Sequence, residues 1–185
     1  MLVAREKKKS NIAEYILYMW QVEDMLRALN LDMEQIDRYL VSAYQTDEQT
    51  RHEIHDWYEN LAAIMKNEKV EKKGHIQALR NNMDELTELH FYLLHEARDL
   101  RYHQLVTMAA QNLVEFRTKA GVGNEVSDVE LAMNGLYGNL MLRLQKKEIN
   151  PDTAKAMETF SKVIAYLAAR YKQMEEEENA KLDKL

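Results

Sequence analysis

The 185-residue sequence contains no cysteine, which excludes disulfide bonds, a thiolate nucleophile and any zinc or iron–sulfur site built on sulfur ligands. One proline and five glycines are too few for the frequent turns of a strand-rich protein, and no alternating run of β-branched residues occurs. The longest uninterrupted apolar run, from Tyr15 to Trp20, is far shorter than the roughly 20 residues that cross a bilayer. We therefore expect an all-α protein without a transmembrane helix.

The charge balance narrows the classes of partner. The chain has 25 basic and 31 acidic side chains, and its formal net charge of -6 argues against an overall electrostatic footprint for nucleic acid or anionic lipid. The basic start MLVAREKKKS is followed by Glu14 before any long apolar run, and no small-residue cleavage site follows, so the pattern differs from that of a signal peptide. We predict a cytoplasmic protein that binds neither membranes nor nucleic acid.

Start and stop signals divide the chain into six or seven predicted helices. Asn11 is placed to cap the first, which ends near Asn30, and Ser127 forms a capping box with Glu130 for a helix that runs to about residue 148. Asn150 and the proline after it then occupy the cap and first-turn positions of the last helix. The other predicted elements are a short helix after Asp32, a helix from Asp47 to about Glu68 with a capping pair at Thr46 and Gln49, one over residues 76–97, and one from Tyr102 to the loop at Gly121 and Gly123.

The predicted helix over residues 76–97 has the most regular apolar spacing. Its steps of three and four residues are typical of the seam of a coiled coil, interrupted by one histidine. The members of this seam are Ile76, Leu79, Met83, Leu86, His90, Leu93 and Ala97.

Two predicted helices, over residues 11–29 and 127–148, are apolar or aromatic around almost their whole circumference. Such a helix is surrounded by other helices, so we predict a single-domain bundle over residues 1–174 with these two helices at its centre. Gly135 and Gly138 lie inside the second of them, where a glycine costs about 1 kcal/mol relative to alanine, and we expect a neighbouring backbone to approach closely there. Residues 175–185 are charged and have no apolar stripe, so we predict a frayed tail.

Several segments resemble those of a known family: NIAEYILYMWQVEDMLRA, WYENL, KGHIQ, LYGNLMLRLQKKEI and the closing Tyr171-Lys172. Over Met1 to about Lys172 the chain is similar to uncharacterised bacterial helical proteins that are known only as a domain of unknown function. The resemblance implies an all-helical single domain. It brings no catalytic or binding residues to this sequence.

Residue types that bind metals gather on one face of the helix after Asp47, at Glu48, His52, His55, Asp56 and Glu59. Their spacing differs from the His-Glu-x-x-His of zinc proteases and from the paired Glu-x-x-His motifs of di-iron bundles. A second helix would have to complete any site. We interpret the group as a solvated charged face, and we predict no metal site and no cofactor.

Two polar side chains occupy apolar surroundings. His90 sits among leucines, where a neutral imidazole needs a partner such as Glu14 or Asp24, and we expect a hydrogen-bonded core histidine, with proton chemistry or a ligand contact as the alternative. Arg143 is flanked by apolar residues. It either forms an ion pair with an acid such as Glu23, which becomes an anion site if it lines a cavity, or extends to the surface.

The segment between the helix after Asp47 and the seam helix is rich in basic residues, namely Lys66, Lys69, Lys72, Lys73 and His75. The free amides at the start of the following helix offer a site for phosphate. Connecting loops are commonly lysine-rich for solubility alone, and no exposed aromatics alternate with these lysines. We therefore do not predict RNA binding.

The function predicted from these features is non-enzymatic. Ten tyrosines, two tryptophans and eleven methionines suit a core or an adaptable protein interface, and we find no nucleophile–base pair, phosphate-binding loop or metal motif. We therefore predict an interaction or scaffold protein that forms a homodimer and binds a further protein, with no catalytic residues. The alternative is a small-molecule-binding or hydrolytic bundle. Its polar cavity, between the first, fourth and sixth predicted helices, would be lined by Glu14, Tyr18, Gln21, His90 and Arg143.

Overall fold

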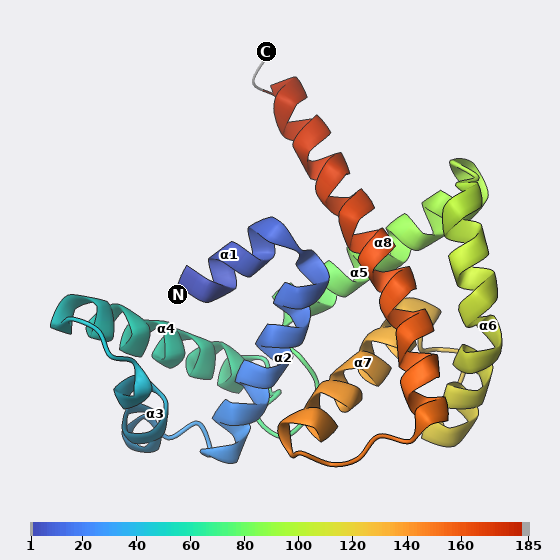
Figure 1. Cartoon of the computed structure of the whole chain (residues 1–185). Coiled ribbons are helices and arrows are strands. Elements are labelled where there is room, and N and C mark those ends of the chain that lie inside the picture. The colour runs from blue at the N-terminus through green and yellow to red at the C-terminus, as the bar shows by residue number, and fades with distance from the viewer. Residues whose placement is uncertain (1, 183–185) are drawn as a thin grey trace. The chain divides into compact units, whose positions relative to one another are not determined.

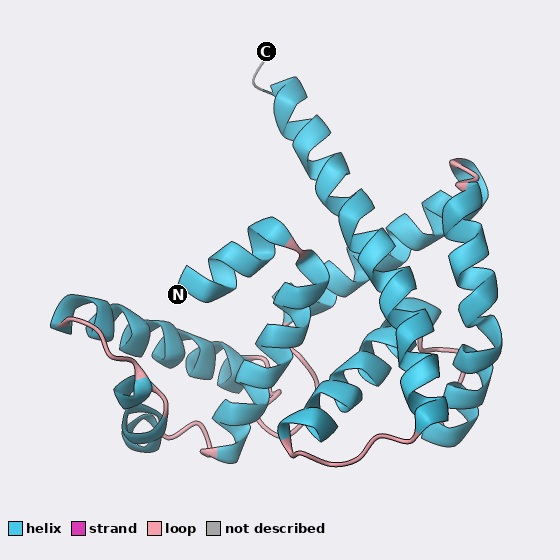
Figure 2. Cartoon of the chain, viewed as in Figure 1, coloured by secondary structure: helices cyan, strands magenta, loops and turns pink. Residues whose placement is uncertain are grey.

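The computed structural model describes residues 2–182, and every regular element in that range is helical (Figure 2). The prediction of an all-α fold is confirmed, but the predicted six or seven helices are too few. No helix within the described range combines the length and hydropathy needed to span a membrane. The elements, labelled in Figure 1, are α1 (Leu2–Ser10), α2 (Ile12–Ala28), α3 (Met33–Tyr39), a 3₁₀ turn η1 (Val41–Ala43), α4 (Glu48–Asn67), α5 (Gln77–Phe91), a π turn η2 (Tyr92–Glu96), α6 (Leu100–Ala120), α7 (Asp128–Leu144) and α8 (Pro151–Leu182).

Helix α1 is the element that the sequence patterns missed. Among its residues 3–10, whose burial is described, only Ala4 is buried, and one apolar residue gives no periodic signal. Three lysines occupy its last turn, where positive charge interacts favourably with the carbonyl end of the helix dipole. One of them, Lys7, forms an ion pair with Glu14 of α2 at 3.1 Å. Local electrostatic interactions therefore favour this short helix, although its sequence has no periodic apolar spacing.

Side-chain caps begin several helices, as predicted. Asn11, Ser127 and Asn150 each accept a hydrogen bond from a backbone amide two or three residues later, at 3.0, 3.1 and 2.8 Å. The predicted pair at the start of α4 was wrong by one residue, because Asp47 and not Thr46 is the cap. A carboxylate is the stronger acceptor, and the Asp47 side chain takes both the amide and the hydroxyl of Thr50.

Helix α5 follows the predicted seam only as far as residue 93. Six members of the seam, from Ile76 to Leu93, are buried, whereas Ala97 is exposed. The π turn accounts for this, since the amide of Ala97 donates to the carbonyl of Tyr92 at 2.9 Å, five residues back. The prediction of a regular helix through residue 97 was therefore wrong in its last turn.

The internal contacts of the chain group into two compact units, residues 1–9 with 14–81 and residues 10–13 with 82–185, hereafter the first and the second unit. In the first unit α3, η1 and α4 pack together. In the second unit α8 packs on both α6 and α7 (Figure 1). That residues 1–174 fold as one domain stays a prediction.

The two helices predicted to be central are buried to different extents. Along α2 only Glu14, Asp24 and Ala28 are exposed, in agreement with an apolar circumference. The buried residues of helix α7 all lie in its first half, where Asp128, Glu130 and Asn134 are nevertheless exposed, and its last residues, Arg143 and Leu144, are exposed as well. A place for both helices at the middle of one bundle stays a prediction.

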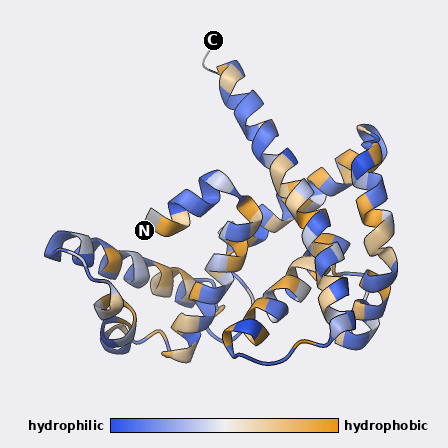
Figure 3. Ribbon diagram, viewed as in Figure 1, coloured by the Kyte–Doolittle hydropathy of each residue, from blue (hydrophilic) through white to orange (hydrophobic). Residues whose placement is uncertain are grey.

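Helix α8 continues to Leu182, across most of the stretch that we expected to fray. Its last turns are hydrophilic (Figure 3) and include the ion pair of Lys172 with Glu176, one turn apart, at 3.8 Å. The predicted tail over residues 175–185 thus lies on a helix as far as residue 182, and residues 183–185 lie outside the described range. Fraying of this segment in solution stays a prediction.

The two glycines of α7 have different surroundings. A Cβ atom added to Gly135 would lie 3.1 Å from ring carbons of Phe160, so the close approach is real, but it comes from a side chain of α8 and not from a backbone. At Gly138 nothing among the described residues lies within 4 Å of such an atom. The predicted close approach was therefore wrong at Gly138.

We expect alanine at these two positions to change stability in opposite directions. Gly138→Ala gains helix propensity without a new contact and should raise the free energy of unfolding by about 1 kcal/mol. Gly135→Ala gains the same propensity but crowds the fully buried Phe160, and overpacking costs about 1–3 kcal/mol, so the variant should be less stable than the parent. Urea unfolding measures both, and equal stabilisation by the two substitutions would show that α8 does not constrain α7 at Gly135.

Candidate functional site

Glu23 of α2 is the most deeply buried charged side chain within residues 2–182, with 1% of its surface exposed. One carboxylate oxygen lies 2.5 Å from Nδ1 of His75, and the other accepts a hydrogen bond from the amide of Ile76 at 2.9 Å. The guanidinium of Arg27, one turn further along α2, lies 3.9 Å from the same carboxylate. A charge that is buried at this depth is stable only with such partners.

The same face of α2 holds the loop between α4 and α5. Arg27 donates to the carbonyl of Val70 at 3.2 Å and also to the carbonyl of Gly74. The ring of His75 stacks on Trp20, with centroids 4.5 Å apart and planes inclined by 15°. We call Glu23, Arg27 and His75 the loop clamp.

The loop clamp changes the interpretation of the basic segment before α5. An imidazole bound to a buried carboxylate has the arrangement of a proton-transfer pair, and His75 is still 31% exposed. The amide of Ile76 is occupied by Glu23 and that of Gln77 by Glu68, at 2.9 and 2.5 Å. These amides are therefore not open to phosphate, in contrast to the arrangement considered from the sequence.

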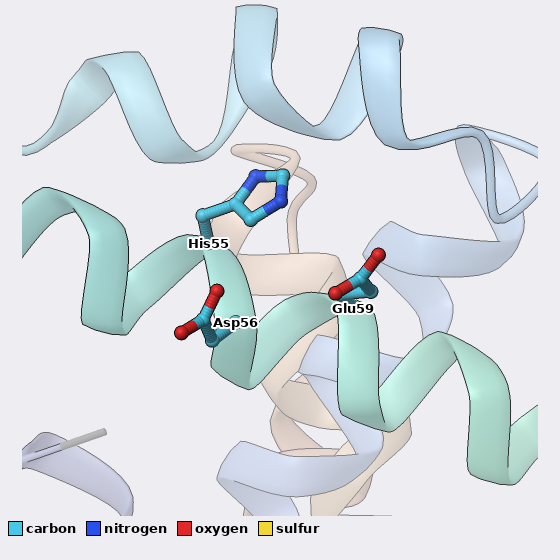
Figure 4. Close-up of side chains that lie close together, drawn as sticks. All are labelled: His55, Asp56 and Glu59. Atoms are coloured by element: carbon cyan, nitrogen blue, oxygen red, sulfur yellow. The ribbon is translucent and has the colours of Figure 1, made fainter.

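The predicted charged face of α4 gains a partner from a second helix. Nδ1 of His55 lies 2.7 Å from a carboxylate oxygen of Asp37 in α3, and this hydrogen bond raises the pKa of His55 above its ordinary value. His55, Asp56 and Glu59 lie side by side on α4 (Figure 4), and one potential ligand atom from each lies within 4.8 Å of the other two. A cleft beside them is lined by Asp37, Val41, Ser42, Glu48, Gln49, Arg51, His52 and His55.

His90 is a buried, hydrogen-bonded histidine, as expected, but its predicted partner was wrong. Nδ1 lies 2.8 Å from the hydroxyl of Tyr102 in α6, which is a phenol and not one of the carboxylates considered from the sequence. Burial lowers the pKa of His90, so its neutral form is favoured. The ring of Tyr102 stacks in turn on Tyr166 of α8, whose hydroxyl donates to Asp99 at 2.7 Å. His90 therefore joins a polar network that links α5, α6 and α8.

The five residues predicted to line a cavity differ in their burial. Glu14 is exposed, Tyr18 and Gln21 are half-buried, His90 is buried, and Arg143 is exposed, which is the surface outcome of the two considered for that arginine. Burial is the main cause that raises the pKa of Tyr18 to about 12, together with the neighbouring Tyr44. Glu14, Tyr18 and Gln21 belong to the first unit, and His90 and Arg143 belong to the second. Their convergence on one cavity stays a prediction.

Two functional arrangements were missed by sequence reasoning. Glu23 was considered as a partner for Arg143, whereas its partners are His75 and the amide of Ile76. The position of Glu23 within an apolar helix was the available signal that it is buried and paired. The neighbouring residues do not indicate which loop would contact it. Asp37 likewise carries no motif, because its role depends on the packing of α3 against α4.

Comparison with known proteins identifies the family of the chain. The family model described as "Domain of unknown function (DUF4924)" matches residues 1–178 and confirms the resemblance noted in the sequence. No curated protein and no solved structure matches the chain.

We expect the loop clamp to contribute strongly to stability. Glu23→Ala removes the acceptor of two hydrogen bonds and leaves His75 and the Ile76 amide without it, so the free energy of unfolding should fall by about 3 kcal/mol. Asp24→Ala is the matched control, since Asp24 is half-exposed and its pair with Arg27 is worth about 1 kcal/mol or less. Urea unfolding compares the two variants. Equal losses would mean that the buried position of Glu23 has no special energetic role.

The pKa of His90 predicts a loss of stability in mild acid. Because burial lowers this pKa in the folded protein, the unfolded chain binds a proton that the folded protein does not as the pH falls below about 6.5. The contribution of neutral His90 is therefore fully present above that pH and declines below it. His90→Gln keeps a hydrogen-bonding group but does not titrate, so its unfolding free energy should depend less on pH between about 7 and 5 than that of the parent.

A His90→Gln curve of unfolding free energy against pH that runs parallel to that of the parent protein would contradict this prediction, because it would mean that His90 does not titrate differently in the folded and unfolded states.

Proposed function

The chain belongs to the DUF4924 family, a domain of unknown function, and we propose that it is a non-enzymatic interaction protein that forms a homodimer through the outer face of α6. As part of the same proposal, we place it in the bacterial cytoplasm and expect a further protein partner. The resemblance to a bacterial family supports the source. The observation that carries the proposal is the composition of one exposed helix face.

The outer face of α6 is exposed and uncharged for its whole length. Eight side chains lie within an arc of about 120° at 100° per residue, and all of them are exposed. In a chain of which 30% is charged, a solvated face of this length is expected to carry several charges. We call it the uncharged face, and its members are Leu100, His103, Gln104, Thr107, Ala110, Gln111, Val114 and Thr118.

The apolar members of the uncharged face have the spacing of a helix-pairing seam. Leu100 and Val114 are 79% and 65% exposed, and Thr107 lies midway between them, seven residues from each. Residues seven apart recur on the same side of a helix and form the contact line of two-stranded helix pairs. A second helix would therefore meet all three at once.

The face is also suited to pairing with a copy of itself. If two α6 helices pair antiparallel with Thr107 on the two-fold axis, Leu100 of each copy meets Val114 of the other, as an isologous contact requires. Arg101 and Glu115 lie on the same flank of the face. Antiparallel pairing brings the cation of one copy towards the anion of the second copy, which favours this direction over the parallel one.

The size of the face sets the strength that we expect. Helix α6 has 21 residues, and one face of such a helix covers less than the about 800 Å² per partner of a standard stable interface. The dimer should therefore form reversibly at micromolar concentration. Reversible pairing of this kind suits an interaction protein.

A charge placed on the uncharged face should prevent dimer formation. Ala110→Arg brings two like charges close to the two-fold axis and should weaken the dimer at least tenfold in sedimentation velocity. Ala165→Arg makes the same change at an exposed position of α8 and should leave the dissociation constant unchanged. A parent protein that stays monomeric at every soluble concentration would overturn the proposal, as would equal effects of the two substitutions.

Charge reversal tests the antiparallel register. Arg101→Glu should weaken the dimer, and adding Glu115→Arg in the same chain should restore it, because the two substitutions exchange the signs across the contact. A double variant that pairs no better than the single one would contradict this register.

A further inference from the structure

Three side chains on one face of α4 offer ligand atoms at a separation that suits a single ion. One atom from each of His55, Asp56 and Glu59 lies within 4.8 Å of the others. Zinc binds nitrogen and oxygen ligands at about 2.0–2.2 Å, so two atoms on the same ion are at most about 4.4 Å apart. Small side-chain rotations that move these ligand atoms by a few tenths of an ångström close the difference.

The imidazole of His55 is already oriented for such a role by Asp37. The Asp37 carboxylate occupies Nδ1 at 2.7 Å, which leaves Nε2 as the remaining nitrogen of the ring. In metal sites, the histidine ligand almost always donates its other N–H group to a carboxylate or carbonyl in this way. Asp37 comes from α3, so the arrangement is more than a row of acids along one helix.

The placement of His55, Asp56 and Glu59 on α4 also suits the binding of one ion. His55 and Glu59 are one helical turn apart, and Figure 4 shows the imidazole and the Glu59 carboxylate projecting to the same side of α4, with Asp56 beside them. His55 and Asp56 are half-buried, Glu59 is exposed, and His55 also lines the adjacent cleft. The ring is therefore held in place and still open to solvent.

From these observations we propose that His55, Asp56 and Glu59 form a binding site for a divalent transition-metal ion of the Zn²⁺ type, with Asp37 as the positioning residue for the imidazole. One imidazole and two carboxylates suit zinc, cobalt or nickel, whereas calcium takes six to eight oxygen ligands. Three protein ligands leave at least one coordination position for water or a small anion. Metal binding at this site does not require the proposed dimer.

Titration of the untagged full-length protein with Zn²⁺ in a calorimeter tests the site, and we expect one ion per chain. Glu59→Gln removes one ligand at an exposed position and should weaken binding at least tenfold without loss of the fold. His55→Asn should weaken it further. Asp37→Asn keeps all three ligands but loses the carboxylate partner of the ring, and it should weaken binding about 10–100-fold.

Matched controls separate this site from adventitious surface binding. Glu53→Gln on the same helix and His95→Asn in the π turn replace exposed residues outside the site and should leave the affinity for Zn²⁺ unchanged. Co²⁺ provides a second measurement, since its visible absorption changes when nitrogen and oxygen ligands replace water. Unchanged Zn²⁺ affinity in both His55→Asn and Glu59→Gln would overturn the proposal. Equal losses in the control variants, Ca²⁺ binding as tight as that of Zn²⁺, or half an ion per chain would overturn it as well.

Discussion

A buried carboxylate sets the path of the chain in the first unit. Removing Glu23 from water costs several kcal/mol unless its oxygens receive hydrogen bonds, and α2 itself has no free donors on that face because its amides are bonded within the helix. The donors come from His75 and Ile76, at the point where the loop becomes α5. The beginning of α5 is therefore fixed by an acid more than fifty residues earlier, and Arg27 fixes the preceding part of the same loop through backbone carbonyls.

The second unit uses the same principle with a neutral pair. His90 and Tyr102 bury an imidazole and a phenol that satisfy each other, and the pairing joins the end of α5 to the first turn of α6. Apolar packing alone allows helices to slide by a turn at small cost, whereas a buried polar pair is satisfied in only one register. In both units, a few polar groups in apolar helices thus specify which segments meet.

The parts of the fold that depend on neighbouring residues could be predicted from the sequence. The caps at Ser127 and Asn150 were identified correctly, because each needs only a side-chain oxygen and the amides that follow it. The parts of the fold that depend on tertiary contacts could not be predicted from the sequence. Gly135 and Gly138 are indistinguishable in the sequence, yet Phe160 packs on only the first of them.

The same distinction holds for the candidate sites. The histidine and acids of α4 were found from their spacing, but the carboxylate that orients the imidazole belongs to another helix. His90 was recognised as a core residue from its place in the apolar seam. Its partner, Tyr102, lies beyond a π turn that the apolar spacing of the seam does not predict. Spacing identifies which residues share a face, whereas only the folded chain shows what meets that face.

The π turn between residues 92 and 96 makes this part of the chain sensitive to its length. A π turn accommodates one more residue than the corresponding α turn, so deletion of a single residue there would let α5 continue along a regular path. The chain would then leave α5 from a point rotated by about 100° around the helix axis and shifted by about 1.5 Å along it. Tyr102 would be carried away from His90 although neither residue had been altered. The number of residues in this segment thus sets the distance between the His90 and Tyr102 side chains. Substitutions within the segment should be tolerated far better than insertions or deletions.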